Sequence, residues 1–134
     1  GVFNPCQAFL PAMLEGGYGR IVNMSSVSAQ QGGGVFSKTP YSAAKAGVLG
    51  LTRSLAREMA PEGITVNAIC PAIVATDIRA GNSAEDEDRL TATIPMRRLG
   101  TGRDIANMYV WLSSEDAGYV TGTTQSVNGG AYIA

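Results

Sequence analysis

The feature that most constrains the fold of this chain is a regular alternation between helical segments and short apolar runs. Helical patterns cover residues 2–14, 40–60 and 101–112; apolar runs follow the first two at residues 20–24 and 64–70, and a last strand is predicted after the third at residues 123–127. Short runs rich in β-branched residues are typical of strands buried on both faces. Their alternation with helices predicts an α/β fold with a parallel sheet. Three such strands alone would leave bare sheet edges, so we expect part of a larger, doubly wound sheet.

Capping and breaking residues set the boundaries of these elements. Pro40 suits the first position of the second helix, because a proline there loses no helical hydrogen bond. Thr101 and Asp104 have the spacing of a capping box that opens the third helix. The other predicted segments are a helix end near residues 16–17, loops at residues 25–39 and 71–82, an acidic, weakly helical stretch at residues 83–92 and a turn at residues 128–130.

Length and composition indicate one packed domain, residues 1–134. Hydrophobic residues make up 45% of the chain and charged residues 16%, which favours a core over disorder. The net charge is −1 and the basic residues are scattered, so we expect no nucleic-acid partner and no membrane-surface partner. No run of about 18 apolar residues is present, so we expect no transmembrane helix.

The histidine and cysteine content narrows the possible chemistry. The chain has no histidine, which excludes histidine-based triads and most zinc sites. Cys6 and Cys70 lie far apart and in no motif, so we interpret them as free, buried thiols in a reducing compartment. A single disulfide is the alternative. Because the N-terminus also lacks a signal-peptide pattern, we expect a cytoplasmic location.

The sharpest chemical motif is Tyr41-Ser42-Ala43-Ala44-Lys45, at the start of the second helix. Residues four apart on a helix share a face, so the phenol of Tyr41 and the ammonium of Lys45 are neighbours. The ammonium and the helix dipole both favour the phenolate form, as general acid–base catalysis requires. The alternative is an exposed helical pair without a catalytic role, because this spacing is common by chance.

Three serines follow the first apolar run: Ser25, Ser26 and Ser28. In parallel sheets, ligands bind at the carboxyl ends of the strands, so a serine in this loop can meet the tyrosine that opens the next helix. A hydroxyl beside a phenol can hydrogen-bond a carbonyl or alkoxide oxygen. The alternative is that these serines serve only the geometry of the turn.

Four segments together resemble the short-chain dehydrogenase/reductase family. They are Gly19-Arg20-Ile21-Val22-Asn23-Met24-Ser25-Ser26, Tyr41-Ser42-Ala43-Ala44-Lys45-Ala46-Gly47, Gly63-Ile64-Thr65-Val66-Asn67 and Val127-Asn128-Gly129-Gly130. Their order and spacing match the C-terminal half of a typical member over essentially the whole chain. The resemblance implies a Rossmann-type fold, NAD or NADP as cofactor, and hydride transfer between a secondary alcohol and a ketone.

The resemblance also implies roles for individual residues. Tyr41 would be the acid–base that protonates the substrate oxygen during reduction. Lys45 would support the tyrosine and hold the nicotinamide ribose. Ser26 would orient the substrate, with Ser28 as the alternative, because the loop at residues 32–40 is slightly longer than in many members.

A further segment, Pro71-Ala72-Ile73-Val74-Ala75-Thr76, resembles the family's Pro-Gly-x-x-x-Thr stretch. The resemblance implies cofactor contacts from Pro71, Val74 and Thr76, with the Thr76 hydroxyl at the nicotinamide carboxamide. Ala72 stands where the family has glycine, and it would strain a backbone that needs positive φ. The alternative role of Thr76-Asp77 is a helix cap.

The acidic stretch Glu85-Asp86-Glu87-Asp88 predicts a solvated helical face. Consecutive carboxylates fan around a helix axis and do not converge on one ion, so we expect no metal site. This region resembles the substrate-binding lid of the family.

The glycine-rich phosphate loop of the family has no counterpart here. The cluster Gly32-Gly33-Gly34 lacks the required spacing, and the chain starts at Gly1 rather than at a methionine. We expect a cut or processed end, with the N-terminal nucleotide-binding half and the family's catalytic asparagine missing. The substrate, a small carbonyl or alcohol, stays open between a ketoacyl thioester, a sugar or polyol, and a small cyclic ketone.

Two hypotheses follow from this reading. In the first, the chain is the catalytic half of an oxidoreductase. In the second, it is a truncated, non-catalytic assembly module. In the family the long helix packs against its counterpart in a dimer, commonly within a tetramer, so we expect a homo-oligomer. The small residues that would permit close approach are Ala43, Ala46, Gly47 and Gly50.

Overall fold

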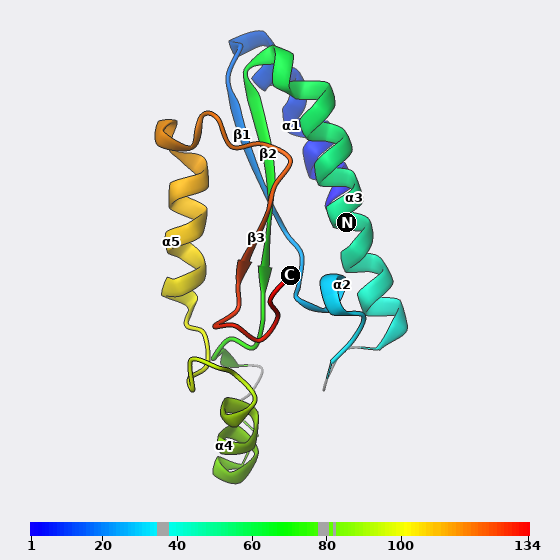
Figure 1. The fold of residues 1–134 in the computed structure, drawn as a ribbon. Helices are drawn as coiled ribbons and strands as arrows, with labels where there is room; N and C mark the ends of the chain where they lie inside the picture. The colour runs from blue at the N-terminus through cyan, green and yellow to red at the C-terminus, as the bar shows by residue number, and fades with distance from the viewer. Residues whose placement is uncertain (35–37, 78–80, 82) are drawn as a thin grey trace.

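A computed structural model describes residues 1–34, 38–77, 81 and 83–134 (Figure 1). Its strands are β1 (Gly19–Met24), β2 (Ile64–Pro71) and β3 (Thr124–Val127). Its α-helices are α1 (Phe3–Gly16), α2 (Ser28–Gln31), α3 (Thr39–Met59), α4 (Ala84–Ala92) and α5 (Gly102–Ser113), with short 3₁₀ turns η1 (Ala60–Glu62) and η3 (Glu115–Ala117).

The strands form one three-stranded parallel sheet in the order β1-β2-β3. The register runs from Gly19↔Ile64 to Met24↔Ile69 between β1 and β2, and from Ala68↔Thr124 to Pro71↔Val127 between β2 and β3. All three strands therefore end at the same edge of the sheet. In Figure 1, α2 and the N-terminal end of α3 lie at this edge, and α4 lies beyond it.

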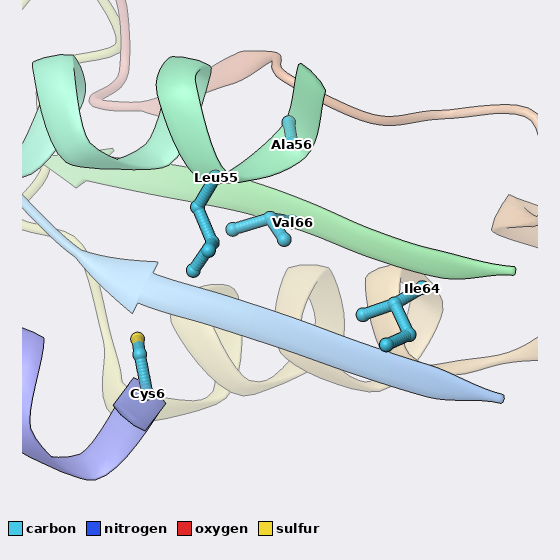
Figure 2. Packing of buried hydrophobic residues seen from close by; sticks show 5 residues of the cluster. All are labelled: Cys6, Leu55, Ala56, Ile64 and Val66. Carbon is cyan, nitrogen blue, oxygen red and sulfur yellow. The ribbon is translucent and has the colours of Figure 1, made fainter. Parts of the chain in front are cut away.

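Helices cover both faces of the sheet, as the alternation predicts (Figure 1). On one face, α1 and α3 pack over a core of Cys6, Leu55, Ala56, Ile64 and Val66. Figure 2 shows Leu55 of α3 reaching down beside Val66 of β2. On the other face, α5 buries Ile105 and Leu112 against Ile69. The central strand β2 is buried along nearly its whole length because helices cover it from both sides.

The predicted helix and strand boundaries are confirmed to within a few residues. The capping box of Thr101 and Asp104 opens α5, with the backbone N–H of Asp104 donating to the Thr101 hydroxyl at 3.2 Å. Helix α1 ends at Gly17, whose φ of 61° places it in the left-handed region that glycine favours. Helix α1 also continues through Pro11.

One predicted loop is partly wrong. Within the stretch predicted as a loop at residues 25–39, Ser28–Gln31 forms the helix α2, and residues 35–37 lie outside the described part. This single turn has no apolar periodicity of its own. It is held by one local bond, from the backbone N–H of Ser28 to the Ser26 hydroxyl, and by one distant bond, between Gln30 and Ser126 of β3.

Two asparagines from the family-like segments tie loops to the sheet. The buried Asn67 of β2 donates to the Val120 carbonyl at 2.7 Å and accepts from the backbone N–H and the hydroxyl of Thr123. Asn128 accepts from the Gly130 backbone N–H and donates to the Tyr132 carbonyl. These bonds fix the segments before and after β3, which explains why asparagine suits both positions.

Cys6 and Cys70 are buried and free, so the prediction of two free thiols is confirmed and the disulfide alternative is wrong. Among the helices in the described ranges, none has both the length and the apolar character needed to cross a bilayer.

Candidate active site

The loop after β1 stays attached to the sheet and carries the serines in a fixed backbone. The N–H of Ser25 donates to the Ile69 carbonyl at 2.8 Å, and the N–H of Val27 donates to the Pro71 carbonyl at 2.9 Å. The parallel ladder between β1 and β2 therefore continues past Met24. As a result, Ser25 and Ser26 are held at the carboxyl edge of the sheet rather than on a free loop.

Tyr41 and Lys45 lie in the first two turns of α3. Helix α3 begins after an extended Lys38, with Pro40 in its first turn. The Lys45 Nζ lies 5.7 Å from the centre of the Tyr41 ring, and the Tyr41 side chain is 45% exposed. The predicted adjacency of the phenol and the ammonium is therefore present, with the phenol open to a ligand.

The ammonium of Lys45 also reaches the end of β1. Its Nζ donates a hydrogen bond to the Met24 carbonyl at 3.0 Å. This contact places the charge of Lys45 at the carboxyl edge of the sheet, where ligands of parallel sheets bind. An ammonium has three donors, and this bond occupies one of them.

Ser25 makes a contact that the sequence analysis did not predict. Its hydroxyl donates to the backbone carbonyl of Lys45 at 2.8 Å, from a residue that is 3% exposed. Side chains two apart on a strand point to the same face, and Asn23 points toward α3, where it hydrogen-bonds Thr52. That alternation is the signal that would have identified Ser25, rather than Ser26, as the serine facing α3.

The two candidate substrate-orienting serines, Ser26 and Ser28, are both buried and lie side by side. The Ser26 hydroxyl accepts the backbone N–H of Ser28 at 3.1 Å. Because Ser26 acts as the acceptor in this bond, its own hydroxyl hydrogen stays available for a ligand oxygen. Ser28 is the first residue of α2.

The buried thiol of Cys70 neighbours Ser25 and Ser26. Cys70, near the end of β2, is completely buried and neighbours the side chain of Ser25 and the backbone of Ser26. Burial raises the pKa of this thiol above its ordinary value, and the hydrogen bond with Ser25 opposes that rise only in part. Cys70 is therefore a neutral packing group at neutral pH.

The predicted cofactor residues follow β2. Pro71 is its last residue, Val74 forms an isolated parallel bridge with Gly100, and Thr76 is exposed. Ala72 has no positive φ, so alanine in place of the family's glycine causes no strain. A helix cap formed by Thr76-Asp77 would involve residues 78–80, which lie outside the described part of the chain.

The acidic stretch forms α4, and its carboxylates contact groups of the same helix. Glu85 pairs with Arg89 at 3.1 Å, and Asp86 accepts the hydroxyl hydrogen of Ser83, the N-cap residue. Within the described ranges, no group of three acidic or cysteine side chains is arranged to hold a metal ion.

A cavity of about 290 Å³ lies at the carboxyl end of β3, on the α5 side. It is lined by Ile73, Arg98, Asn107, Val127 and Asn128, among others. Tyr41, Lys45 and Ser26 do not line it. The chemical groups of the candidate site are therefore not part of this cavity.

The chain is similar to several known proteins. A family model described as enoyl-(acyl carrier protein) reductase matches residues 1–132. An uncharacterized short-chain type dehydrogenase/reductase of Sinorhizobium fredii is 50% identical over 134 residues, which cover 99% of this chain and 53% of the relative. An acetoacetyl-CoA reductase of Rhizobium meliloti is 47% identical, with 100% of this chain and 55% of the relative covered.

Solved structures agree with these relatives. A 3-oxoacyl-[acyl-carrier protein] reductase from Brucella melitensis matches with a TM-score of 0.93 and 38% identity, covering 99% of this chain and 49% of that one. A reductase of the same description and organism, with bound NAD, matches with a TM-score of 0.90 and 36% identity, covering 99% and 48%. The chain thus spans about half the length of the proteins it matches.

Proposed function

The chain belongs to the short-chain dehydrogenase/reductase family, and from this premise we propose that it forms the catalytic part of an NAD(P)-dependent oxidoreductase. The reaction is the interconversion of a secondary alcohol and a ketone. The observation that carries the proposal is the pairing of Tyr41 and Lys45 at the carboxyl end of β1. Residues 1–134 then act as one partial domain of the whole enzyme.

Each of the three residues has a distinct role in the proposed mechanism. The Tyr41 hydroxyl donates a proton to the substrate oxygen during reduction and removes it during oxidation. The charge of Lys45 favours the phenolate that remains after this transfer. The Ser26 hydroxyl donates a hydrogen bond to the substrate oxygen, since its oxygen already accepts from Ser28. Ser28 is the alternative for this third role.

The residues present fit a nicotinamide cofactor. Within the described part of the chain, Lys45 uses one of its three donors on Met24, which leaves donors for the hydroxyls of the nicotinamide ribose. Pro71 ends β2, Val74 and the exposed Thr76 follow it, and these three residues would hold the carboxamide end. When bound, the nicotinamide would supply or accept the hydride. A structural neighbour with bound NAD supports this assignment.

The names of the relatives favour one of the three substrate classes left open by the sequence. Acetoacetyl-CoA reductases and 3-oxoacyl-[acyl-carrier-protein] reductases recur among them. We therefore favour a 3-oxoacyl thioester as the carbonyl substrate, reduced at the ketone. Sugars, polyols and small cyclic ketones become the comparison compounds in the assay.

The proposal includes a homo-oligomer, a dimer or a tetramer, formed through α3. Ala43, Ala46, Gly47 and Gly50 are exposed, and a Cβ built on Gly47 or Gly50 meets no neighbouring atom. A face of small side chains allows two helices to approach closely.

The two free, buried thiols are consistent with a reducing, cytoplasmic location.

The experiment for this proposal measures cofactor binding and turnover. We expect the enzyme that carries this chain to oxidise NADH or NADPH with acetoacetyl-CoA, and to do so faster than with a sugar ketone or cyclohexanone. Saturable cofactor binding without turnover of any of these ketones would contradict the assigned reaction. If the chain binds neither nicotinamide cofactor, the non-catalytic assembly module is the better description.

A further inference from the structure

The proposed mechanism leaves unused the hydrogen bond from Ser25 to the backbone of α3. The Ser25 hydroxyl donates to the Lys45 carbonyl at 2.8 Å, between residues twenty positions apart. This carbonyl lies inside α3, where it is already the acceptor position for the helical N–H four residues later. The Lys45 carbonyl therefore does not need this bond to have a hydrogen-bond partner. The bond instead fixes the distance between the end of β1 and one turn of α3.

A second hydrogen bond joins the same two elements, and in this bond α3 supplies the donor and the end of β1 the acceptor. The Lys45 Nζ donates to the carbonyl of Met24, the residue directly before Ser25. Neighbouring residues at the end of β1 thus hold Lys45 at both its backbone oxygen and its side-chain nitrogen. Tyr41 lies one turn before Lys45, and Ser26 directly follows Ser25, so this pair of bonds stands between the proposed acid–base and the proposed substrate-orienting hydroxyl.

Ser25 itself is held rigidly. Its backbone N–H donates to the Ile69 carbonyl at 2.8 Å, its side chain is buried, and the thiol of Cys70 lies behind it. A buried hydroxyl in this place has no solvent partner to exchange for the Lys45 carbonyl. Loss of the hydroxyl would leave, of these two bonds, the one from the Lys45 side chain to the Met24 carbonyl.

From this geometry we propose that Ser25 is a positioning residue, which sets Tyr41 and Lys45 at their working distance from Ser26. The inference rests on the proposed function, because it assigns Ser25 to the same site. In this role Ser25 acts through Lys45. Catalytic groups must be held within a fraction of an ångström of their productive geometry, so a tie of this kind affects rate more than binding.

The first test needs no enzymatic activity. The chain has two lysines, Lys38 and Lys45, so an amine-acetylating reagent followed by mass spectrometry reports each separately. Lys38 is exposed and serves as the internal reference. We expect Ser25→Ala to raise the labelling rate of Lys45 relative to Lys38 about fivefold, the change that loss of one hydrogen bond implies. Ser25→Thr keeps the hydroxyl and is expected to restore the wild-type ratio.

Two further variants keep this test decisive. Ser25→Thr combined with Cys70→Ala makes room for the added methyl group if the single variant folds poorly. Ser54→Ala is the matched control, because the Ser54 hydroxyl makes an exposed bond to Glu58 on the same helix, and its Lys45 ratio should not change. An unchanged ratio in Ser25→Ala overturns the proposal. So does a raised ratio that neither hydroxyl-bearing variant restores.

The second test measures turnover. In the active enzyme, Ser25→Ala should lower kcat by about 10- to 100-fold while KM for the ketone stays near the wild-type value. Full kcat in Ser25→Ala, or a change confined to KM, contradicts a positioning role. A wild-type enzyme without turnover removes the proposed function, whereas the labelling ratio still shows whether Ser25 holds Lys45.

Discussion

The side-chain amide of Asn23 donates a hydrogen bond to the hydroxyl of Thr52 at 3.0 Å, in the interior between β1 and α3. Both residues are almost completely buried, and the Cys6 thiol lies 3.8 Å from the other end of the Asn23 amide. This polar contact fixes the position of α3 along β1. Thr52 lies on the same helix as Tyr41 and Lys45, about two turns beyond Lys45.

A buried hydrogen bond of this kind gives a stability prediction. Thr52→Val keeps the shape of the side chain but leaves the Asn23 N–H unpaired, so it should lower the free energy of unfolding by about 1–3 kcal/mol. Thr52→Ser keeps the hydroxyl and loses one methyl group, at a cost of about 1 kcal/mol. Urea denaturation measures both. If Thr52→Val is no more destabilising than Thr52→Ser, the bond does not contribute to stability.

Arg97 gives a second prediction, which concerns the end of α4. It is the one non-glycine residue with positive φ in the described ranges, at 54°, and its guanidinium donates to the Ala92 carbonyl at 2.8 Å. Arg97→Ala loses this bond and keeps the backbone strain, whereas Arg97→Gly loses the bond and relieves the strain. We expect Arg97→Gly to be more stable than Arg97→Ala by about 1 kcal/mol in chemical denaturation. Equal stabilities would show that the left-handed backbone carries no strain.

The ion pair of Arg98 and Asp104 gives a prediction about pH. The guanidinium of Arg98, followed by the hydroxyl and N–H of Thr101, holds the pKa of the Asp104 carboxyl well below its usual range. A carboxyl with a lowered folded-state pKa stabilises the fold above its unfolded pKa of about 4, and that stability is lost as the pH falls through the folded value. Asp104→Asn should therefore have a lower melting temperature than the wild type, and the difference should stay constant between pH 8 and about pH 5.

Below about pH 4, the melting temperatures of the wild type and Asp104→Asn should converge. Asp88→Asn, on the exposed face of α4, is the matched control and should show no such dependence. Because the pair is exposed, salt should also reduce the difference. A difference that grows as the pH falls would contradict the assignment.

The buried thiols give a prediction about reactivity. Burial raises the pKa of both Cys6 and Cys70, so neither is a thiolate at pH 8 in the folded chain. A thiol-specific disulfide reagent should react with the native protein only at the rate of unfolding. In denaturant it should react rapidly with both thiols. Rapid reaction of one thiol in the native protein would show that its side chain is accessible.

Much of the fold follows from local sequence patterns. The capping box of Thr101 and Asp104 and the apolar runs of β1 and β2 each carry their signal within a few residues. The boundaries of these elements were therefore predictable. Helix α2 was not predictable, because one of its partners, Ser126, comes from elsewhere in the chain.

The site was predictable to a similar extent. The spacing of Tyr41 and Lys45 on one helix already placed them together, since helical geometry is local. The bond from Ser25 to Lys45 joins a strand end to a helix turn, so it depends on how far α3 lies from β1, which no local pattern encodes. The choice between Ser26 and Ser28 depends on the same packing and on a bound substrate, and it stays a prediction.

The most direct measurement of the central claim is the ketone-dependent oxidation of NADH or NADPH by the Tyr41→Phe variant of the enzyme that carries this chain. Tyr41 is 45% exposed, so removal of its hydroxyl should leave the melting temperature unchanged. We expect kcat to fall by about 100-fold or more, the contribution of a general acid. Wild-type turnover in Tyr41→Phe would contradict the assignment of Tyr41 as the acid–base.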